Sequence, residues 1–466
     1  MEDGLRHARR EDHKALMRWL IAPLPLSAFM EDVFERRALL VKRPNARSYY
    51  EGWMGKTDIE RLLAEKRLNY TFHVDVTRYE DGAKVTYNGE GAADADEVWR
   101  RYSDGCSVRV LHPQRWIDPL WRMLSMMERV WGSSAGCNAY LTPAGQAQGF
   151  APHCDDIDAF VLQVEGKKRW RVYAPRSEEE TLPRVSSPDF APDELGELVL
   201  EAVLEPGDLL YMPRGLVHQA ESLSDAHSLH LTVSVNQCNT WADLFATALP
   251  RALEIAAEEN LELRRAVPAE AWDHLGVVHA DEEGGGVGSS SAQRSAFLDH
   301  AGRLLEAVLR QFPIDAAADL AMQRSLAERL PPPPRKKPPP APPPEEAECL
   351  APLRLVRLRA KGCARLVSED GLAVVHHSVA NPRLFHMAGE DATDDDAQGE
   401  AAQEKEAADA EARAPLEFEL SDAPVLEALL SAWPKPIRVR DLPTTEEDAG
   451  ELAASLVAAG ILVIES

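Results

Sequence analysis

The sequence predicts an α+β protein in which an all-β core comes first and mainly helical segments follow. Between residues 20 and 235, short β-prone runs are separated by Gly, Pro and Asp, which is typical of an all-β core. Between 241 and 330, leucines recur at helical spacing and indicate a small helical domain. Near the C-terminus we expect amphipathic helices at 425–433 and 451–459, each followed by a short β-prone run. This order is compatible with a winged-helix fold.

Length and charge limit the function classes. A chain of 466 residues usually forms two to four compact units. The 77 acidic and 51 basic residues give a formal net charge of -26, which argues against non-specific binding to nucleic acid and favours a basic or neutral partner. The helix expected at 451–459 has no cluster of Lys or Arg for phosphates, so we predict that direct nucleic-acid binding is not its role.

Cysteine usage and hydropathy indicate the compartment. The six cysteines form no CxxC pair, so neither a zinc ribbon nor a disulfide framework is indicated and a reducing compartment fits best. The first residues are charged and lack an apolar core, and no apolar run is long enough to span a bilayer. We therefore expect a soluble intracellular protein that does not contact membranes.

Three biased segments divide the chain. The run LPPPPRKKPPPAPPP at 330–344 should be extended polyproline II; we interpret it as a spacer rather than as a ligand of SH3-type domains. The acidic, Ala-rich stretch 389–414 predicts a disordered insertion, and 281–291 predicts a flexible loop. The predicted domains are 1–240 (β core), 241–330 (helical), 331–347 (Pro-rich linker) and 348–466 (C-terminal module containing the insertion).

A candidate metal site lies in the segment GFAPHCDDIDAFVLQVEGKKRWRVYAP, where His153 precedes Asp155 by two residues. In an extended strand this spacing places both side chains on one face. His218, in PGDLLYMPRGLVHQA, follows 65 residues after His153 (218 − 153) and supplies a third ligand. An HxD pair alone is weak, but two His and one carboxylate on one side of a metal suit a non-haem Fe(II) that must also bind a cosubstrate and O2.

The following segment predicts a β-hairpin, with a turn at Glu165 and Gly166 between AFVLQV and KKRWRVYAP. Strand alternation places Lys168 on the inward face together with Trp170. A buried ammonium needs an anion, and the distal carboxylate of 2-oxoglutarate would provide one. The alternative is a lysine whose head group reaches solvent from a solvated face.

Other strand residues are weaker candidates. Asn138 and Tyr140 share a strand face in CNAYLTP and could hydrogen-bond the cosubstrate, as could Ser234 in LHLTVSV, although each is more often an ordinary strand residue. We interpret His227 and His230 as core or substrate-side polar residues, because the metal site is complete without them. Cys154, His376 and His377 are expected to take no part in metal binding.

The motifs NAYLTP, QGFAPHCDDIDAFVLQVEGKKRWRVY, GDLLYMPRGLVHQA and HSLHLTVS together resemble the JmjC-domain ribosomal oxygenases of the nucleolar type, over about residues 19–241. The resemblance implies a double-stranded β-helix (cupin/JmjC) core, a helical dimerisation domain and a C-terminal winged-helix domain. It also implies iron held by His153, Asp155 and His218. The residues implied to contact 2-oxoglutarate are Lys168, Asn138, Tyr140 and Ser234, while Arg109 lies in a family-like segment without an assigned role.

The function implied by the resemblance is an Fe(II)- and 2-oxoglutarate-dependent dioxygenase that hydroxylates a histidine of a ribosomal protein. The alternatives are a histone lysine demethylase acting on chromatin and transcription through the same site, and a non-catalytic scaffold, against which the intact ligand set argues. The resemblance further implies a basic protein substrate (a ribosomal protein or a histone tail), a homodimer formed through 241–330, and a nuclear, nucleolar location. The acidic insertion at 389–414 and the lack of a basic N-terminal tail depart from the family pattern.

Overall fold

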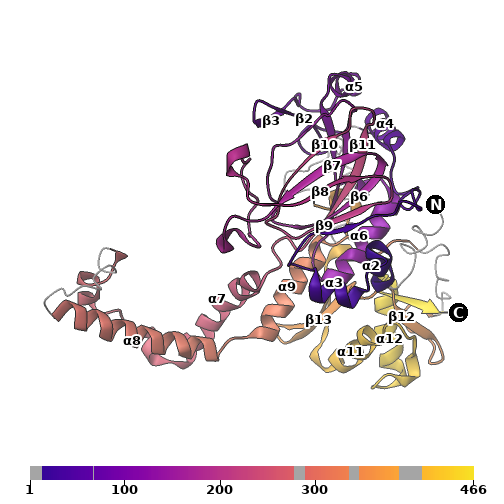
Figure 1. The fold of residues 1–466 in the computed structure, drawn as a ribbon. Helices are drawn as coiled ribbons and strands as arrows, with labels where there is room; N and C mark the ends of the chain where they lie inside the picture. Colours follow the sequence, from indigo (N-terminus) through magenta and orange to yellow (C-terminus); the bar gives the residue numbers. More distant parts are fainter. Residues whose placement is uncertain (1–12, 67, 278–288, 335–345, 388–411, 466) are drawn as a thin grey trace. The chain divides into compact units, whose positions relative to one another are not determined.

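The computed structural model describes residues 13–66, 68–277, 289–334, 346–387 and 412–465 (Figure 1). The predicted loop at 281–291 and the acidic insertion at 389–414 lie mainly outside these residues. The chain divides into two compact units: residues 239–324 form one, and the residues before and after them form the other.

The β core of the larger unit consists of two antiparallel sheets. The larger sheet has eight strands in the order β1-β9-β6-β11-β5-β4-β2-β3, and the smaller has three in the order β10-β7-β8. The bounds in the larger sheet are β1 (Leu39–Val41), β2 (Val74–Glu80), β3 (Ala83–Thr86), β4 (Ser107–Leu111), β5 (Gly136–Thr142), β6 (Asp158–Gly166), β9 (Leu209–Met212) and β11 (Ser228–Val235). Those in the smaller sheet are β7 (Lys168–Tyr173), β8 (Leu198–Leu204) and β10 (Val217–Ser222).

From β6 onward the chain alternates between the sheets. It runs from β6 in the large sheet to β7 and β8 in the small one, returns for β9, crosses to β10, and ends the core with β11 in the large sheet. This alternation is the arrangement expected for a double-stranded β-helix. It also brings residues that are far apart in the sequence to the same space between the sheets.

The predicted β6–β7 hairpin is wrong. β6 pairs with β9 and β11, whereas β7 pairs with β8 and β10, so the turn at Gly166 passes the chain from one sheet to the other. Gly166 has φ 60°, and a Cβ atom there would lie 1.7 Å from the carbonyl oxygen of His227, so a side chain would not fit. The inward position of Lys168 holds nevertheless, because strand alternation does not depend on which strand is the partner.

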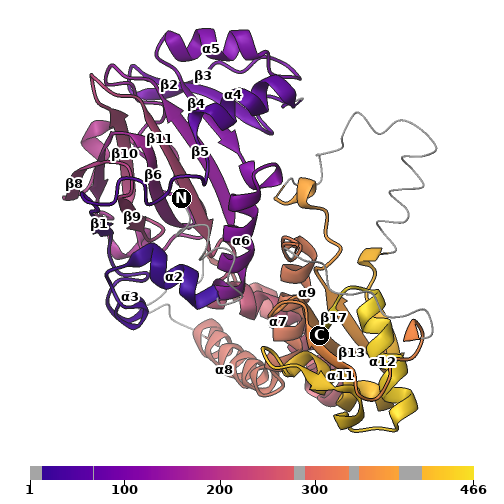
Figure 2. The ribbon, with the colours of Figure 1, turned by 90° about the vertical axis from the view of Figure 1, so that its right-hand side faces the viewer.

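Helices cover the outer face of the large sheet. They are α2 (His13–Ile21), α3 (Leu26–Asp32), α4 (Lys56–Glu65), α5 (Ala95–Ser103) and α6 (Asp118–Trp131). α6 packs on β5 and β11 and buries Met123, Leu124 and Met127 completely (Figure 2). At about 1.5–3 kcal/mol for each large apolar side chain, this burial is the main force that holds the helix on the sheet.

The C-terminal module also belongs to the larger unit. Its strands form two three-stranded sheets, β16-β12-β17 and β13-β14-β15. The bounds are β12 (Leu355–Leu358), β13 (Ala364–Glu369), β14 (Leu372–His377), β15 (Leu416–Glu419), α11 (Ala423–Ser431), β16 (Ile437–Arg438), α12 (Glu446–Ala458) and β17 (Leu462–Glu465). Leu426, Leu429, Leu456 and Ile461 lie in its apolar core.

Polar contacts join the C-terminal module to α6. The imidazole of His386 lies 3.0 Å from the carboxylate of Glu128, and both side chains are 1% exposed. The indole of Trp121 donates to the carbonyl oxygen of Pro331 at 2.8 Å, and Arg122 donates to that of Pro334. The first prolines of the predicted linker therefore lie against the core.

The smaller unit is helical, with α7 (Trp241–Glu259), α8 (Ser289–Arg310) and most of α9 (Ile314–Glu328). Its small core contains Ala252, Ala256 and Val308. Many large apolar side chains of the unit are exposed, including Trp241, Phe245, Leu249, Leu253, Trp272, Leu298, Leu305 and Leu309. Across the described chain, none of the helices has the length and apolarity needed to cross a membrane.

Candidate active site

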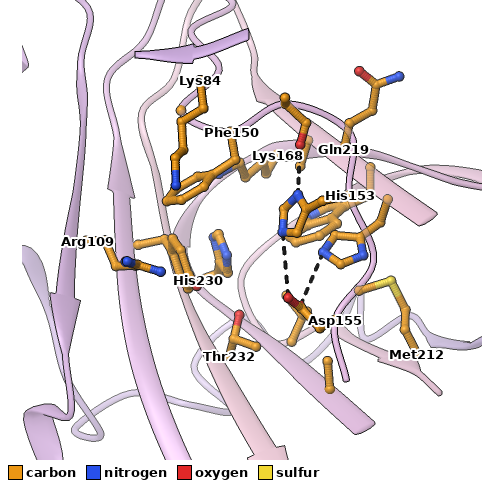
Figure 3. A pocket seen from close by; sticks show the side chains of 18 of the residues that line it. Lys84, Arg109, Phe150, His153, Asp155, Lys168, Met212, Gln219, His230 and Thr232 are labelled. Carbon is orange, nitrogen blue, oxygen red and sulfur yellow. Dashed lines mark hydrogen bonds and ion pairs between the residues drawn. The ribbon is translucent and has the colours of Figure 1, made fainter. Parts of the chain in front are cut away.

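A pocket of about 250 Å³ lies between the two sheets of the core (Figure 3). Both sheets contribute to its lining, as do the loop between β5 and β6 and the loop between β7 and β8. The side chains that converge on it include Arg109, Tyr140, Phe150, His153, Asp155, Lys168, Trp170, His218 and His230. Residues from five different strands and a loop thus meet at one place.

His153, Asp155 and His218 meet at one side of the pocket. The Nε2 atom of His153 lies 3.8 Å from one carboxylate oxygen of Asp155, and that of His218 lies 3.7 Å from the other. One ligand atom from each residue falls within 4.8 Å of the others. Among the described residues, this is the one group of three or more His, Cys, Asp or Glu side chains close enough to hold a metal ion.

The local structure around the three residues differs from the expected extended strand. His153 lies in the connection before β6 and forms an isolated bridge with His218 on β10, with backbone hydrogen bonds of 3.2 and 2.9 Å. The chain bends at Asp156 and Ile157, just after Asp155 and before β6 begins. The pairing of the two histidines across strands, rather than alternation within one strand, places their rings side by side with centroids 4.7 Å apart.

Backbone carbonyl groups orient both imidazoles. The Nδ1 atom of His153 donates to the carbonyl oxygen of Ala151 at 2.7 Å, and that of His218 donates to the carbonyl oxygen of Leu216 at 3.1 Å. Both rings therefore point their Nε2 atoms toward Asp155, and the neutral form of each ring with its proton on Nδ1 would have the free Nε2 lone pair that a metal ligand needs. Burial, reinforced by the neighbouring His153, lowers the pKa of His218 to about 4, so this ring is neutral at pH 7.

Lys168 is the second notable group in the pocket. Its side chain is buried, and its Nζ atom donates to the hydroxyl of Thr142 at 3.1 Å. Within the described part of the chain, no carboxylate lies within ion-pair distance of this ammonium group. Burial lowers the pKa of Lys168 to about 7, because the charged form loses its hydration. Two of its three donor positions are thus available to a ligand.

Unpaired polar atoms surround Lys168. Among the described residues, neither the Nε1 atom of Trp170 nor the Nδ1 atom of His230 has a hydrogen-bond partner, although both are buried. The ring of His230 stacks on Tyr140, with centroids 4.8 Å apart and an interplanar angle of 2°, and meets Trp170 edge-on. A buried polar atom without a partner costs about 1–3 kcal/mol, so these groups indicate a site built to receive a polar molecule.

The remaining predicted ligand contacts are placed differently. Tyr140 lines the pocket; burial raises the pKa of its hydroxyl group, and the neighbouring Arg109 and Asn138 act in the opposite direction. Asn138 itself accepts from the backbone of His112 and lies outside the lining. Ser234 lies near the end of β11, opposite Gly136, and is also outside the lining. The roles of Asn138 and Ser234 remain predictions.

The sequence left Arg109 without a role and interpreted His230 only as a core or substrate-side polar residue, and both line the pocket. Arg109 forms an ion pair with Asp75, and His230 lies at the centre of the pocket wall in Figure 3. Both are cross-strand neighbours of Tyr140, on β4 and β11, respectively. Strand register between distant segments would have revealed them, but a single sequence does not provide that register.

Four other residues lie away from the metal ligands. Cys154 packs with Tyr173 and Val217, on the side away from the pocket. His227 pairs with Glu165 at 3.2 Å near the surface. His376 and His377 lie on β14 in the C-terminal module. His227 is therefore neither a core residue nor part of the pocket lining, contrary to the interpretation from the sequence.

Known proteins are similar in sequence to this chain over its whole length. Residues 109–244 match the family model of the JmjC domain. The chain is 38% identical to Ribosomal oxygenase 1 of Rattus norvegicus, covering 100% of this chain and 74% of the relative. It is 36% identical to the bifunctional lysine-specific demethylase and histidyl-hydroxylase NO66 of Dictyostelium discoideum, covering 98% and 84%. The X-ray structure of E. coli ycfD aligns over 95% of this chain and 98% of its own, with TM-score 0.49 and 15% identity.

Proposed function

Since the chain belongs to the ribosomal oxygenase family of JmjC-domain proteins, we propose that it is an Fe(II)- and 2-oxoglutarate-dependent oxygenase that hydroxylates a histidine side chain of a ribosomal protein. One observation carries the proposal. Three metal-ligand atoms converge at one side of the pocket, and a buried ammonium group without a carboxylate partner among the described residues lies in the same pocket. A dicarboxylate that chelates a metal through one end requires this combination.

The residues fit both groups. Two imidazole nitrogens and one carboxylate form the donor set that leaves further positions open on Fe(II). Lys168 would hold the distal carboxylate of 2-oxoglutarate, with the Nε1 atom of Trp170 as a further donor nearby. When bound, the metal and cosubstrate activate O2, with conversion of 2-oxoglutarate to succinate and CO2.

The protein's own side chains orient the reactants and exclude water. The stacked rings of Tyr140 and His230, with Trp170 against their edge, form an aromatic wall beside the metal ligands. Because these rings are packed against each other, they restrict both the position of a ligand and the access of solvent. Phe150 extends this wall toward His153, with ring centroids 6.1 Å apart.

Charge supports a basic protein substrate. The net charge of the chain is -26, and exposed Asp189 lies in the pocket lining. The short helix Glu178–Glu180 adds three exposed or half-exposed carboxylates in the same region of sequence. Opposite charges of this kind accelerate association with a basic segment of a ribosomal protein. Such a substrate agrees with a nuclear, nucleolar location, which fluorescence microscopy of a tagged chain would test.

The other two parts of the chain have proposed roles as well. We assign residues 241–330 to homodimerisation, because leucines on α8 are exposed at positions 298, 305 and 309, which share one helix face. We assign residues 348–466 to a winged-helix module used for packing or protein contacts. The first turn of α12 carries Glu446, Glu447 and Asp448, which would repel a phosphate backbone.

A turnover assay tests the proposed function. Purified full-length protein is incubated with Fe(II), 2-oxoglutarate and a histidine-containing ribosomal peptide, and succinate and peptide mass are measured. We expect succinate formation coupled to the gain of one oxygen atom on the peptide. Failure to form succinate above background with any ribosomal peptide would contradict the proposal. Formaldehyde release from a methylated histone peptide at a higher rate would instead favour demethylation through the same site.

A further inference from the structure

A row of side chains crosses four strands beside the pocket. Asp75 on β2 is the cross-strand partner of Arg109 on β4, Arg109 is the partner of Tyr140 on β5, and Tyr140 is the partner of His230 on β11. Neighbours in this row interact with each other: Arg109 donates to Asp75, the guanidinium of Arg109 interacts electrostatically with Tyr140, and Tyr140 stacks on His230. We call these four residues the polar row. All of them except Asp75 line the pocket.

Asp75 is fixed on both sides. Its side chain is 9% exposed, and one carboxylate oxygen accepts from the Nε atom of Arg109 at 3.0 Å. The other oxygen accepts from the side-chain amide of Asn88 at 2.8 Å, and Asn88 in turn accepts from the backbone of Val76 at 2.9 Å. The carboxylate therefore cannot turn away from Arg109 without leaving buried donors unpaired.

The partly buried Arg109 and the buried Lys168 differ in charge balance. Arg109 has a carboxylate partner in Asp75, whereas Lys168 has a hydroxyl partner in Thr142. A third cation of the lining, Lys84, is exposed to solvent. An incoming carboxylate would find an uncompensated buried charge at Lys168, but at Arg109 it would compete with Asp75.

We propose that Asp75 is a positioning residue that sets the direction in which 2-oxoglutarate binds. By balancing the charge of Arg109, it leaves Lys168 as the buried cation, among the described residues of the pocket, to which the distal carboxylate is drawn. This inference rests on the proposed function. Arg109 then remains a donor for neutral oxygen atoms, held in place by the ion pair and by Tyr140.

Asp75→Asn removes the charge with little change in shape and frees Arg109 to attract the cosubstrate in a second, unproductive orientation. Unproductive binding adds affinity without turnover, so kcat and the KM for 2-oxoglutarate should fall together while kcat/KM changes little. Calorimetric titration of the Mn(II)-loaded protein with 2-oxoglutarate, without O2, should show affinity higher by about threefold or more, the size expected for a half-exposed charge pair.

Two further variants separate charge from packing. Arg109→Gln leaves the Asp75 carboxylate unbalanced beside the pocket, so it should weaken 2-oxoglutarate binding to the Mn(II) protein. The double variant D75N/R109Q is neutral at both positions and should return the affinity close to that of the unchanged protein. Circular dichroism melting curves identify any variant that does not fold.

Several outcomes would overturn the inference. Weaker or unchanged 2-oxoglutarate binding by folded Asp75→Asn would do so. A double variant D75N/R109Q with the same 2-oxoglutarate affinity as Asp75→Asn would also do so. If Asp75→Asn does not fold, unchanged or tighter binding of 2-oxoglutarate by Arg109→Gln would also overturn the inference. Failure of the unchanged protein to bind 2-oxoglutarate at all would instead contradict the proposed function.

Discussion

The pocket and the helical unit differ in the kind of side chain that lacks a suitable environment. The pocket buries polar groups without partners among the described residues, such as the Nδ1 atom of His230 and the Nε1 atom of Trp170. The helical unit instead exposes apolar side chains, such as Trp241 and Leu305, which are 75% and 57% exposed. Unpaired polar atoms in a closed space fit a small polar ligand, whereas apolar side chains on an open surface fit another protein. The two regions therefore lack different kinds of partner.

Loss of the metal ligand set should have the largest effect. Asp155→Ala removes the carboxylate that faces both imidazoles and should lower turnover at least about a hundredfold, because second-sphere changes alone cost about 10–100-fold. Succinate formation and metal content by atomic emission measure the result. The matched control is Asp156→Ala, since Asp156 is adjacent but outside the pocket lining. Activity unchanged by Asp155→Ala would remove the metal assignment.

Replacement of the buried Lys168 should weaken the binding of 2-oxoglutarate without lowering the stability of the unliganded protein. Lys168→Met keeps the length of the side chain but removes the charge, so we expect the KM for 2-oxoglutarate to rise about 10–100-fold. The melting temperature of the unliganded protein should not fall, because a buried ammonium without a carboxylate partner is replaced by an apolar group.

Lys167→Met is the control for this change, because Lys167 lies in the connection just before β7 and pairs with Glu205 at the protein surface. A lower melting temperature with an unchanged KM would mean that Lys168 serves the fold and not the cosubstrate.

Charges placed on the exposed apolar surface should act on assembly alone. Leu305→Glu with Leu309→Glu on α8 should raise the dimer dissociation constant about tenfold or more, because burial of each leucine contributes about 1.5–3 kcal/mol. Light scattering across a concentration series measures the effect. Arg303→Glu lies on another face of α8 and should leave assembly unchanged. A protein that is monomeric before any substitution would contradict the proposed dimer.

The smallest expected effect is on pH dependence. Burial lowers the pKa of Lys168 to about 7, and a bound carboxylate favours the charged form, so binding of 2-oxoglutarate takes up a proton above that pH. Affinity should therefore fall as pH rises from 7 to 8, by less than about tenfold because one group titrates. Calorimetry in buffers of different ionisation enthalpy measures the proton uptake. Proton release at pH 8 would contradict this assignment.

The sequence identified the candidate metal ligands and Lys168 for reasons that the structure makes clear. His153 and Asp155 are close in the chain, and the inward direction of Lys168 follows from alternation within one strand. The hairpin prediction failed because a short turn between two β-prone runs does not reveal that the runs belong to different sheets. Asp75 was not found, and His230 was interpreted only as a core or substrate-side polar residue, because their positions beside the pocket depend on strand register, which arises from tertiary packing.

The C-terminal helix illustrates a smaller error with a recognisable cause. The helix predicted at 451–459 begins at Glu446, because Thr445 caps it by accepting a hydrogen bond from the backbone of Asp448. The motif Thr445 to Asp448 was a sequence signal for this start. The apolar spacing of the later turns was followed instead, and that spacing does not mark a helix terminus.

The carbonyl groups that orient His153 and His218 have a consequence for mutational robustness. These acceptors belong to the backbone of Ala151 and Leu216, so no substitution of a single side chain deletes them. A saturation mutagenesis screen should therefore identify the ligands themselves but no residue whose side chain orients the imidazoles. The backbone path sets the orientation of both rings. The same orientation should therefore persist in related proteins that have lost catalytic activity but kept the fold.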